Sequence, residues 1–237
     1  MSASERVMVN ERFCGPPGTG NGGYVAGLVA ERLGARADVA LRRPTPLSTP
    51  LRLRRGSGGW LLETEAEGEL LVAGEAAAPV LPRLCPPPAP RFEEALEASE
   101  SLPEHPFPHC FVCGPARVEG DGLRIFAAPL ARRDGVVAAP WIPDASLCAD
   151  GVHVDAPFLW SALDCPGAMV AMAERPRPML LARMTGELSG RVRSGERCVV
   201  VGWEIARDGR KHISGTALYG EDGTLRGASE QLWIEPR

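Results

Sequence analysis

A nineteen-residue stretch from Val154 to Met172 carries only two charged residues, Asp155 and Asp164. Its apolar side chains leave no polar face wide enough for a surface helix, and a helix that is apolar on nearly every side belongs in a protein core. Asp155 stands two residues before Pro157, as a helix N-cap stands before a proline in the first turn. The pattern therefore predicts a buried helix from Pro157 to Met172.

The middle of this helix holds Asp164, a carboxylate that is costly to bury unless another group pairs with it. Pro166 follows two residues later, removes a backbone donor and is expected to kink the helix, which frees the carbonyl of Ala162. A charge and a helix break within one apolar segment indicate a functional site. The alternative is an aspartate that only hydrogen-bonds to a neighbouring strand.

A second apolar helix is predicted from Tyr24 to Leu33, after a loop with five glycines that runs from Gly15 to Gly23. The loop opens like a phosphate-binding Walker A loop, but Asn21 and Gly22 stand where that motif needs Lys and then Ser or Thr. Nucleotide hydrolysis is therefore not expected. A glycine loop before a helix still offers free N–H groups and a positive dipole end, which suit an oxyanion as well as a phosphate. The alternative is a tight turn without a ligand.

Alternating segments bounded by glycine and Asp-Gly turns predict antiparallel strands in both halves of the chain. They are residues 6–13, 37–42, 50–55, 60–66 and 70–77, then 123–127, 135–141, 180–188, 197–206, 211–219 and 225–234. Each half thus has one apolar helix followed by an antiparallel meander, a repeat of pattern rather than of residues. The pattern indicates an α+β fold with two antiparallel sheets, each wrapped around a long central helix and able to join the other edge to edge.

The composition changes between these halves. Nine prolines fall within residues 79–108, around a short acidic stretch, and indicate a linker. The predicted organisation is an N-terminal repeat over residues 1–78, a Pro-rich linker over 79–108 and a C-terminal repeat over 109–237.

The composition limits the binding partners and the cellular compartment that we expect for this protein. With 44% hydrophobic and 24% charged residues the chain is an ordinary globular protein, and a net charge of -4 gives no reason to expect nucleic acid or an anionic membrane as a partner. No run of eighteen apolar residues could span a membrane, and residues 1–8 resemble no leader sequence. Seven scattered cysteines do not form a disulfide pattern, so we expect a reduced, cytoplasmic protein. Basic pairs such as Arg42–Arg43 are either solvated turns or a rim that contacts phosphate.

The segment Cys110-Phe-Val-Cys113, with His105 and His109 upstream, suggests half of a zinc site. Structural zinc needs four ligands, and a second matching pair is absent from the sequence. Buried thiols in a loop are therefore the preferred interpretation, and we predict no metal and no cofactor. Cys165 stands beside Asp164 but has no histidine nearby in the sequence, and a cysteine in a core helix is usually inert.

Three segments carry a resemblance to a known family. They are Gly22-Gly23 at the start of the first helix, Leu159-Trp-Ser-Ala-Leu-Asp164 in the second helix, and Gly227-Ala-Ser-Glu-Gln231 near the C-terminus. Together they resemble the double-hotdog acyl-CoA thioesterases, the group that includes bacterial acyl-CoA thioesterase II. The resemblance implies Asp164, Gln231 and, on the strand after the second helix, Thr185 as catalytic residues. The Cys-Pro-Gly after Asp164 departs from the family pattern.

This resemblance implies a thioesterase that takes an acyl-CoA or acyl-carrier thioester and works as a homo-oligomer. Asp164, helped by Gln231 and Thr185, would orient and deprotonate a water molecule. The amides of Gly22 and Gly23 would bind the oxyanion, next to Asn21 as a further substrate contact. Trp160 is a candidate for the wall of the acyl tunnel, with core packing as its alternative.

Two other functions fit the same fold. A hotdog hydratase or dehydratase would use an Asp/His pair on the loop that enters the helix, and Val152-His-Val-Asp155 is the segment that resembles it. A non-catalytic protein would use the cavity to hold an acyl group or another hydrophobic ligand.

Overall fold

The computed structural model describes residues 4–100 and 104–237. The described strands form one antiparallel sheet of eleven, in the order β1-β3-β4-β5-β2-β8-β11-β10-β9-β7-β6. In the first half the strands are β1 (Ser4–Val7), β2 (Arg36–Leu41), β3 (Leu51–Arg55), β4 (Trp60–Thr64) and β5 (Leu70–Ala76). In the second half they are β6 (Ala128–Pro129), β7 (Val136–Trp141), β8 (Leu180–Leu188), β9 (Cys198–Asp208), β10 (Lys211–Tyr219) and β11 (Leu225–Ile234).

The two halves join through strands β2 and β8, which pair antiparallel with Asp38 opposite Thr185. The sheets of the two halves thus meet edge to edge and form one continuous sheet. The join gives each of these strands a hydrogen-bonding neighbour on both sides, which removes two exposed edges.

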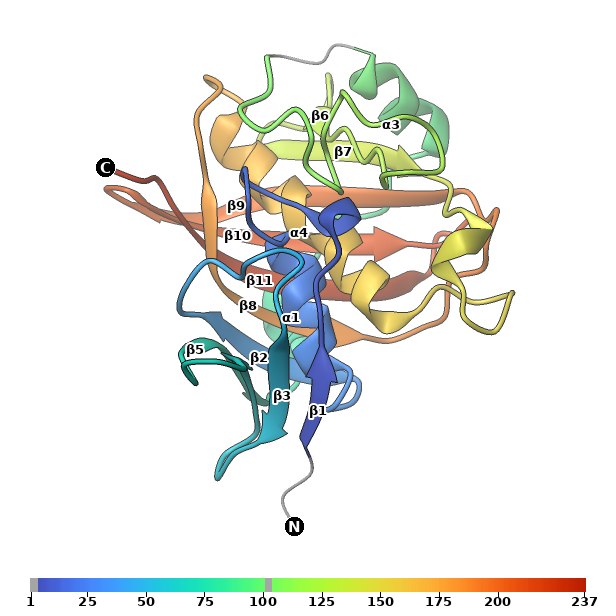
Figure 1. Ribbon diagram of the computed structural model, residues 1–237. Coiled ribbons are helices and arrows are strands. Elements are labelled where there is room, and N and C mark those ends of the chain that lie inside the picture. The colour runs from blue at the N-terminus through green and yellow to red at the C-terminus, as the bar shows by residue number, and fades with distance from the viewer. Residues whose placement is uncertain (1–3, 101–103) are drawn as a thin grey trace.

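Two helices lie side by side against this sheet, α1 (Gly22–Ala30) and α4 (Ala156–Met172) (Figure 1). The sequence predicted both, and α4 matches its predicted range to within one residue. Glycines let the two helices come close, because a Cβ on Gly27 would lie only 2.6 Å from the Cα of Pro157. Asp155 is the N-cap residue, as predicted, but its Oδ2 accepts the N–H of Ala149 in the preceding loop.

The segment predicted as a linker contains two helices, α2 (Leu81–Leu84) and α3 (Phe92–Ser99). These helices lie on the sheet face opposite α4, because their buried residues belong to a core cluster separate from the one that contains α4. Val80, Leu84 and Ala95 pack there with Val199 and Ala217 into a second, smaller core. The Pro-rich segment is therefore a cover for the C-terminal half rather than an extended spacer.

The predicted strand at residues 123–127 is wrong. The backbone N–H groups of Leu123 and Ile125 donate to the carbonyls of Phe111 and Val112, which lie in a loop. The alternating residues thus pack one loop segment against another. The first strand of the second half is β6. The predicted strand at residues 6–13 ends at Val7 and is followed by a 3₁₀ turn from Glu11 to Phe13.

Candidate functional site

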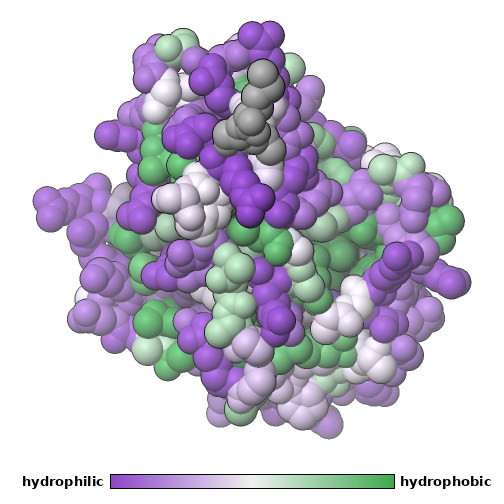
Figure 2. Space-filling view, turned by 90° about the horizontal axis from the view of Figure 1, so that it is seen from below, coloured by the Kyte–Doolittle hydropathy of each residue, from purple (hydrophilic) through white to green (hydrophobic). Residues whose placement is uncertain are grey.

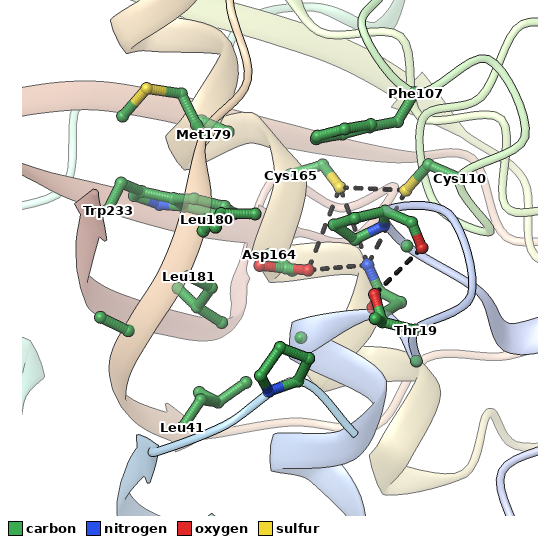
Figure 3. A pocket seen from close by; sticks show the side chains of 18 of the residues that line it. Thr19, Leu41, Phe107, Cys110, Asp164, Cys165, Met179, Leu180, Leu181 and Trp233 are labelled. Carbon is green, nitrogen blue, oxygen red and sulfur yellow. Dashed lines mark hydrogen bonds between the residues drawn. The ribbon is translucent and has the colours of Figure 1, made fainter. Parts of the chain in front are cut away.

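A cavity of about 410 Å³ opens between the glycine loop, α4 and β8 (Figure 3). Most of its lining is apolar, and the polar groups gather at the end formed by the start of α1. The lining includes Leu41, Met169, Met172, Met179, Leu181 and Trp233 on the apolar side, and Asn21, Gly22 and Asp164 at the polar end. A pocket with apolar walls and a few convergent polar groups is typical of a small-molecule site.

Asp164 is the charged group at this polar end. Its side chain is 1% exposed, and its Oδ2 accepts two hydrogen bonds, from Asn21 Nδ2 over 2.8 Å and from the N–H of Gly23 over 2.9 Å. Its Oδ1 is buried and has no hydrogen-bond partner among the described residues. Burial raises the pKa of Asp164 to about 7, against the two N–H donors, which lower it.

Gly23 allows this contact because it has no side chain. A Cβ at this position would lie 2.4 Å from the Cβ of Asp164 and 2.8 Å from the carbonyl oxygen of Trp160. Only glycine fits between the two helices at this point. The Gly23 N–H is thus committed to Asp164, and the prediction that it binds an oxyanion directly is not supported by this geometry.

Asn21 connects the helix start to the carboxylate. Its side-chain oxygen accepts the N–H of Tyr24 over 2.9 Å and so caps α1, while its Nδ2 donates to Asp164. Gly22 lines the cavity at the first position of α1. Among the described residues no group accepts a hydrogen bond from the Gly22 N–H, as is usual for the first turn of a helix.

Gln231 and Thr185 form no hydrogen bond with this carboxylate among the described residues. Gln231 is 1% exposed and its Nε2 donates to the carbonyl of Leu163 over 2.6 Å, while its Oε1 accepts Trp233 Nε1 over 2.8 Å. Neither Gln231 nor Thr185 is among the described residues that line the cavity. The structure therefore brings Asp164 together with Asn21, Gly22 and Gly23 at the cavity, while Gln231 contacts the backbone next to Asp164.

Trp160 is a core residue rather than part of the cavity wall. Its ring packs on Gly186 of β8, where a Cβ would come within 2.7 Å of the indole. Other side chains, Met169 among them, line the cavity. Phe158 instead belongs to a ring cluster with Phe13 and Tyr24.

The Asp/His pair required by a hydratase is not at this site. His153 Nδ1 lies 2.9 Å from Asp150 Oδ2 in a surface hollow that it shares with Arg191 and Arg193. Asp155 is occupied by the loop contact to Ala149. This geometry gives no support to the hydratase alternative.

Three thiols that were not predicted to meet form a group beside Asn21. The Sγ atoms of Cys110, Cys113 and Cys165 all lie within 4.8 Å of one another and are buried. Hydrogen bonds from the thiols of Cys113 and Cys165 hold the pKa of Cys110 well below its usual range, and burial raises the pKa of Cys113 well above it. The Cys-x-x-Cys spacing was the signal for two of them. The third is not near them in sequence and was recognisable only in three dimensions.

No described helix is long and apolar enough to cross a membrane.

At the cavity mouth the lining includes Arg42 and Arg43. The basic pair singled out in the sequence thus lies beside the cavity, and Arg43 also forms an ion pair with Glu69 at 2.7 Å.

Solved structures share this fold over almost the whole chain. A candidate thioesterase from Novosphingobium aromaticivorans superposes with a TM-score of 0.65 at 16% identity, over 99% of this chain and 96% of that one. The tesB protein of Mycobacterium avium subspecies paratuberculosis gives a TM-score of 0.65 at 14% identity, over 99% and 93%. A protein from Alicyclobacillus acidocaldarius with a hotdog fold gives 0.56 at 13% identity, over 100% and 96%. The chain therefore has the hotdog fold. No family model and no curated protein sequence matches it.

Proposed function

We propose that this protein hydrolyses acyl thioesters in the cavity between α1, α4 and β8, as a double-hotdog thioesterase. The observation that carries the proposal is Asp164, a buried carboxylate with a pKa of about 7 and an unpartnered Oδ1, at the polar end of an apolar cavity. The Novosphingobium neighbour, named as a candidate thioesterase, is a second support.

Asp164 would act as the general base. Its Oδ2 is held by Asn21 and Gly23, so Oδ1 remains to accept a proton from a water molecule that attacks the thioester carbonyl. A base whose pKa lies near the working pH is well matched to this task. The C–S bond then breaks, the thiolate leaves and takes up a proton, and the carboxylic acid is released.

The Gly22 N–H would stabilise the oxyanion formed by the attack. It is the first amide of α1 and lines the cavity, so it combines an available donor with the positive end of the helix dipole. Gly23 would act indirectly, since its N–H donates to the proposed base, Asp164, instead of to the substrate. Gln231 would be a positioning residue that binds the carbonyl next to Asp164 in α4. Thr185 lies on β8 without a cavity contact, and we give it no part in the reaction.

The cavity walls indicate the parts of the substrate. Leu41, Met169, Met179 and Leu181 offer an apolar lining for the acyl chain. Arg42 and Arg43 at the mouth suit the phosphates of a coenzyme A or phosphopantetheine carrier. We expect a homo-oligomer, because hotdog sheets commonly pair, and a cytoplasmic location, because all seven cysteines are free.

The test is release of the free acid and the carrier thiol from a panel of acyl-CoA esters, followed by mass spectrometry so that the protein's own thiols do not interfere. We expect turnover by the natural protein and a drop of about 10²–10⁴-fold in kcat for Asp164→Asn. Asp134→Asn, the same substitution at an exposed loop position, is the matched control and should retain full activity.

Two outcomes would contradict the proposal. One is a folded Asp164→Asn variant that hydrolyses the panel as fast as the natural protein. The other is a natural protein that leaves every ester intact but retains an acyl ligand through purification, which would favour the binding-protein alternative.

A further inference from the structure

Three cysteines from two distant segments meet at the polar end of the cavity. Cys110 and Cys113 come from the loop that precedes β6, and Cys165 comes from the middle of α4. Figure 3 shows Cys110 beside Cys165. Their exposed fractions are 3%, 4% and 6%. No disulfide joins them, and the proposed hydrolysis uses none of the three.

The spacing of the sulfur atoms is that of a tetrahedral metal site. A Zn²⁺–thiolate bond is about 2.3 Å long, so two thiolates on one tetrahedral ion lie roughly 3.8 Å apart. Cys110 Sγ lies 3.7 Å from Cys165 Sγ, and Cys113 Sγ is within 4.8 Å of both. The three sulfurs are therefore close to the positions of three ligands around one ion.

One side-chain amide faces two of the three sulfur atoms. Asn21 Nδ2, one N–H of which donates to Asp164, lies 3.8 Å from Cys110 Sγ and 3.9 Å from Cys165 Sγ, so its other N–H faces these two sulfurs. Hydrogen bonds of this kind orient the ligands of a metal centre and spread their charge.

The local chain geometry also fits a metal-binding turn. Gly114 follows the second cysteine directly, and a Cβ on it would lie 2.5 Å from the backbone N of Cys110. The chain can fold back tightly only because this residue is glycine. The tight turn brings both sulfurs of the Cys-x-x-Cys segment to the same side, toward Cys165.

We propose that Cys110, Cys113 and Cys165 bind one thiophilic divalent ion of the Zn²⁺ class. Soft thiolates select such an ion over Mg²⁺ or Ca²⁺. Three thiols lose three protons as three metal–sulfur bonds form. All three cysteines line the cavity, so the fourth coordination position is open to water from it. Asp164 Oδ2 is 4.0 Å from Cys165 Sγ but already accepts two N–H donors, so it is not the fourth ligand.

Such an ion would link the loop that holds Cys110 and Cys113 to α4, which no disulfide joins among the described residues. It would fasten the loop around residue 110 to α4 at the level of Asp164. Because the site exists only in the folded chain, binding would also raise the melting temperature.

The test uses Co²⁺ as a spectroscopic probe on the fully reduced, metal-free full chain. We expect one Co²⁺ per chain, thiolate-to-cobalt charge-transfer absorption in the near ultraviolet, and displacement of Co²⁺ by Zn²⁺. Cys110→Ser, Cys113→Ser and Cys165→Ser should each weaken the binding about tenfold or more. The matched control is Cys198→Ser, since Cys198 is buried in β9 and is not one of the clustered thiols.

The proposal is overturned if the reduced natural protein gives no charge-transfer band, or if the Cys198→Ser variant loses the band as fully as the three cluster variants do. It is also overturned if peptide mapping of the air-exposed protein finds a disulfide between Cys110 and Cys165 while the reduced protein takes up no metal. Because these readouts need no substrate, they are independent of whether the thioesterase proposal holds. Circular dichroism of each variant separates loss of metal from loss of fold.

Discussion

The N–H of Gly23 donates to Asp164 Oδ2 over 2.9 Å and so fixes the first turn of α1 to the middle of α4. Together with the bond from Asn21 Nδ2, it joins the two halves of the chain at the proposed catalytic centre. It also explains why the buried carboxylate of Asp164 can be accommodated, since Asn21 supplies a second donor from the same turn.

Gly23→Ala should damage both the fold and the reaction. A Cβ would come within 2.4 Å of Asp164, so α1 and α4 must move apart, at a cost of about 1–3 kcal/mol in the free energy of unfolding. Urea unfolding and kcat measured on the same sample check this. Gly58→Ala is the matched control, because a Cβ there meets nothing within 4 Å. Equal stability of the two variants would contradict the close approach.

Activity should depend on the protonation of Asp164. The base works as the carboxylate, and its pKa is about 7, so kcat/KM should rise with pH and level off above about 7. A pH–rate profile from pH 5 to 9 is the measurement. A profile that falls over this range would show that Asp164 does not act as the base.

Stability should depend on pH in the opposite direction. The pKa of Asp164 is raised from an ordinary value of 3.8 to about 7 in the folded protein, so between these values the unfolded chain releases a proton that the folded chain keeps. This contribution to the free energy of unfolding is fully present below about pH 4 and is lost as pH rises through about 7, by at most about 1.4 kcal/mol per pH unit. Asp164→Asn removes it.

The melting temperature of Asp164→Asn relative to that of the natural protein should therefore rise between pH 4 and pH 7 and stay constant above. Thermal unfolding of both proteins across this range, in buffers of equal ionic strength, gives the comparison. A difference that does not change with pH would show that the Asp164 carboxyl has an ordinary pKa.

Asn21→Asp separates the two tasks of Asn21. The new carboxylate keeps an oxygen for the N–H of Tyr24, so α1 remains capped, but it replaces the donor to Asp164 with a second acceptor. Two carboxylates at this distance cannot both ionise easily, so the pH at which activity appears should move upward. Asn21→Ala should instead lose about 0.5–2 kcal/mol of stability with the cap. An unchanged pH–rate profile in Asn21→Asp would contradict the contact.

Gln231→Met tests whether Gln231 positions the helix or takes part in the chemistry. Its amide is committed to Leu163 and Trp233, so its loss should lower the free energy of unfolding by about 1–3 kcal/mol. We expect kcat of the folded fraction to fall by less than about tenfold, since Gln231 does not reach the cavity. A loss of two orders of magnitude in kcat at unchanged stability would restore the direct catalytic role that the sequence resemblance implies.

The clearest predictions from sequence concern elements whose periodicity is strong. The helix that contains Asp164 and strand β8 were placed within a residue, because an all-apolar helix and a strand bounded by turns leave few alternatives. The segment at residues 123–127 has the same alternation as a strand, yet its N–H groups pair with a loop. Alternation of apolar and polar residues indicates which side chains are buried, but it does not indicate which backbone groups pair by hydrogen bonds.

For the candidate site, the sequence alone singled out Asp164 and the glycine turn as candidates, since a charge in an apolar helix and five glycines before another helix are both costly unless they have a role. It did not reveal that the Gly23 N–H donates to Asp164, that the Gln231 amide hydrogen-bonds to the carbonyl of Leu163, or that Cys165 lies beside Cys110 and Cys113. Each of these depends on how two helices and a loop approach one another, and that distance is fixed by the packing of segments more than fifty residues apart.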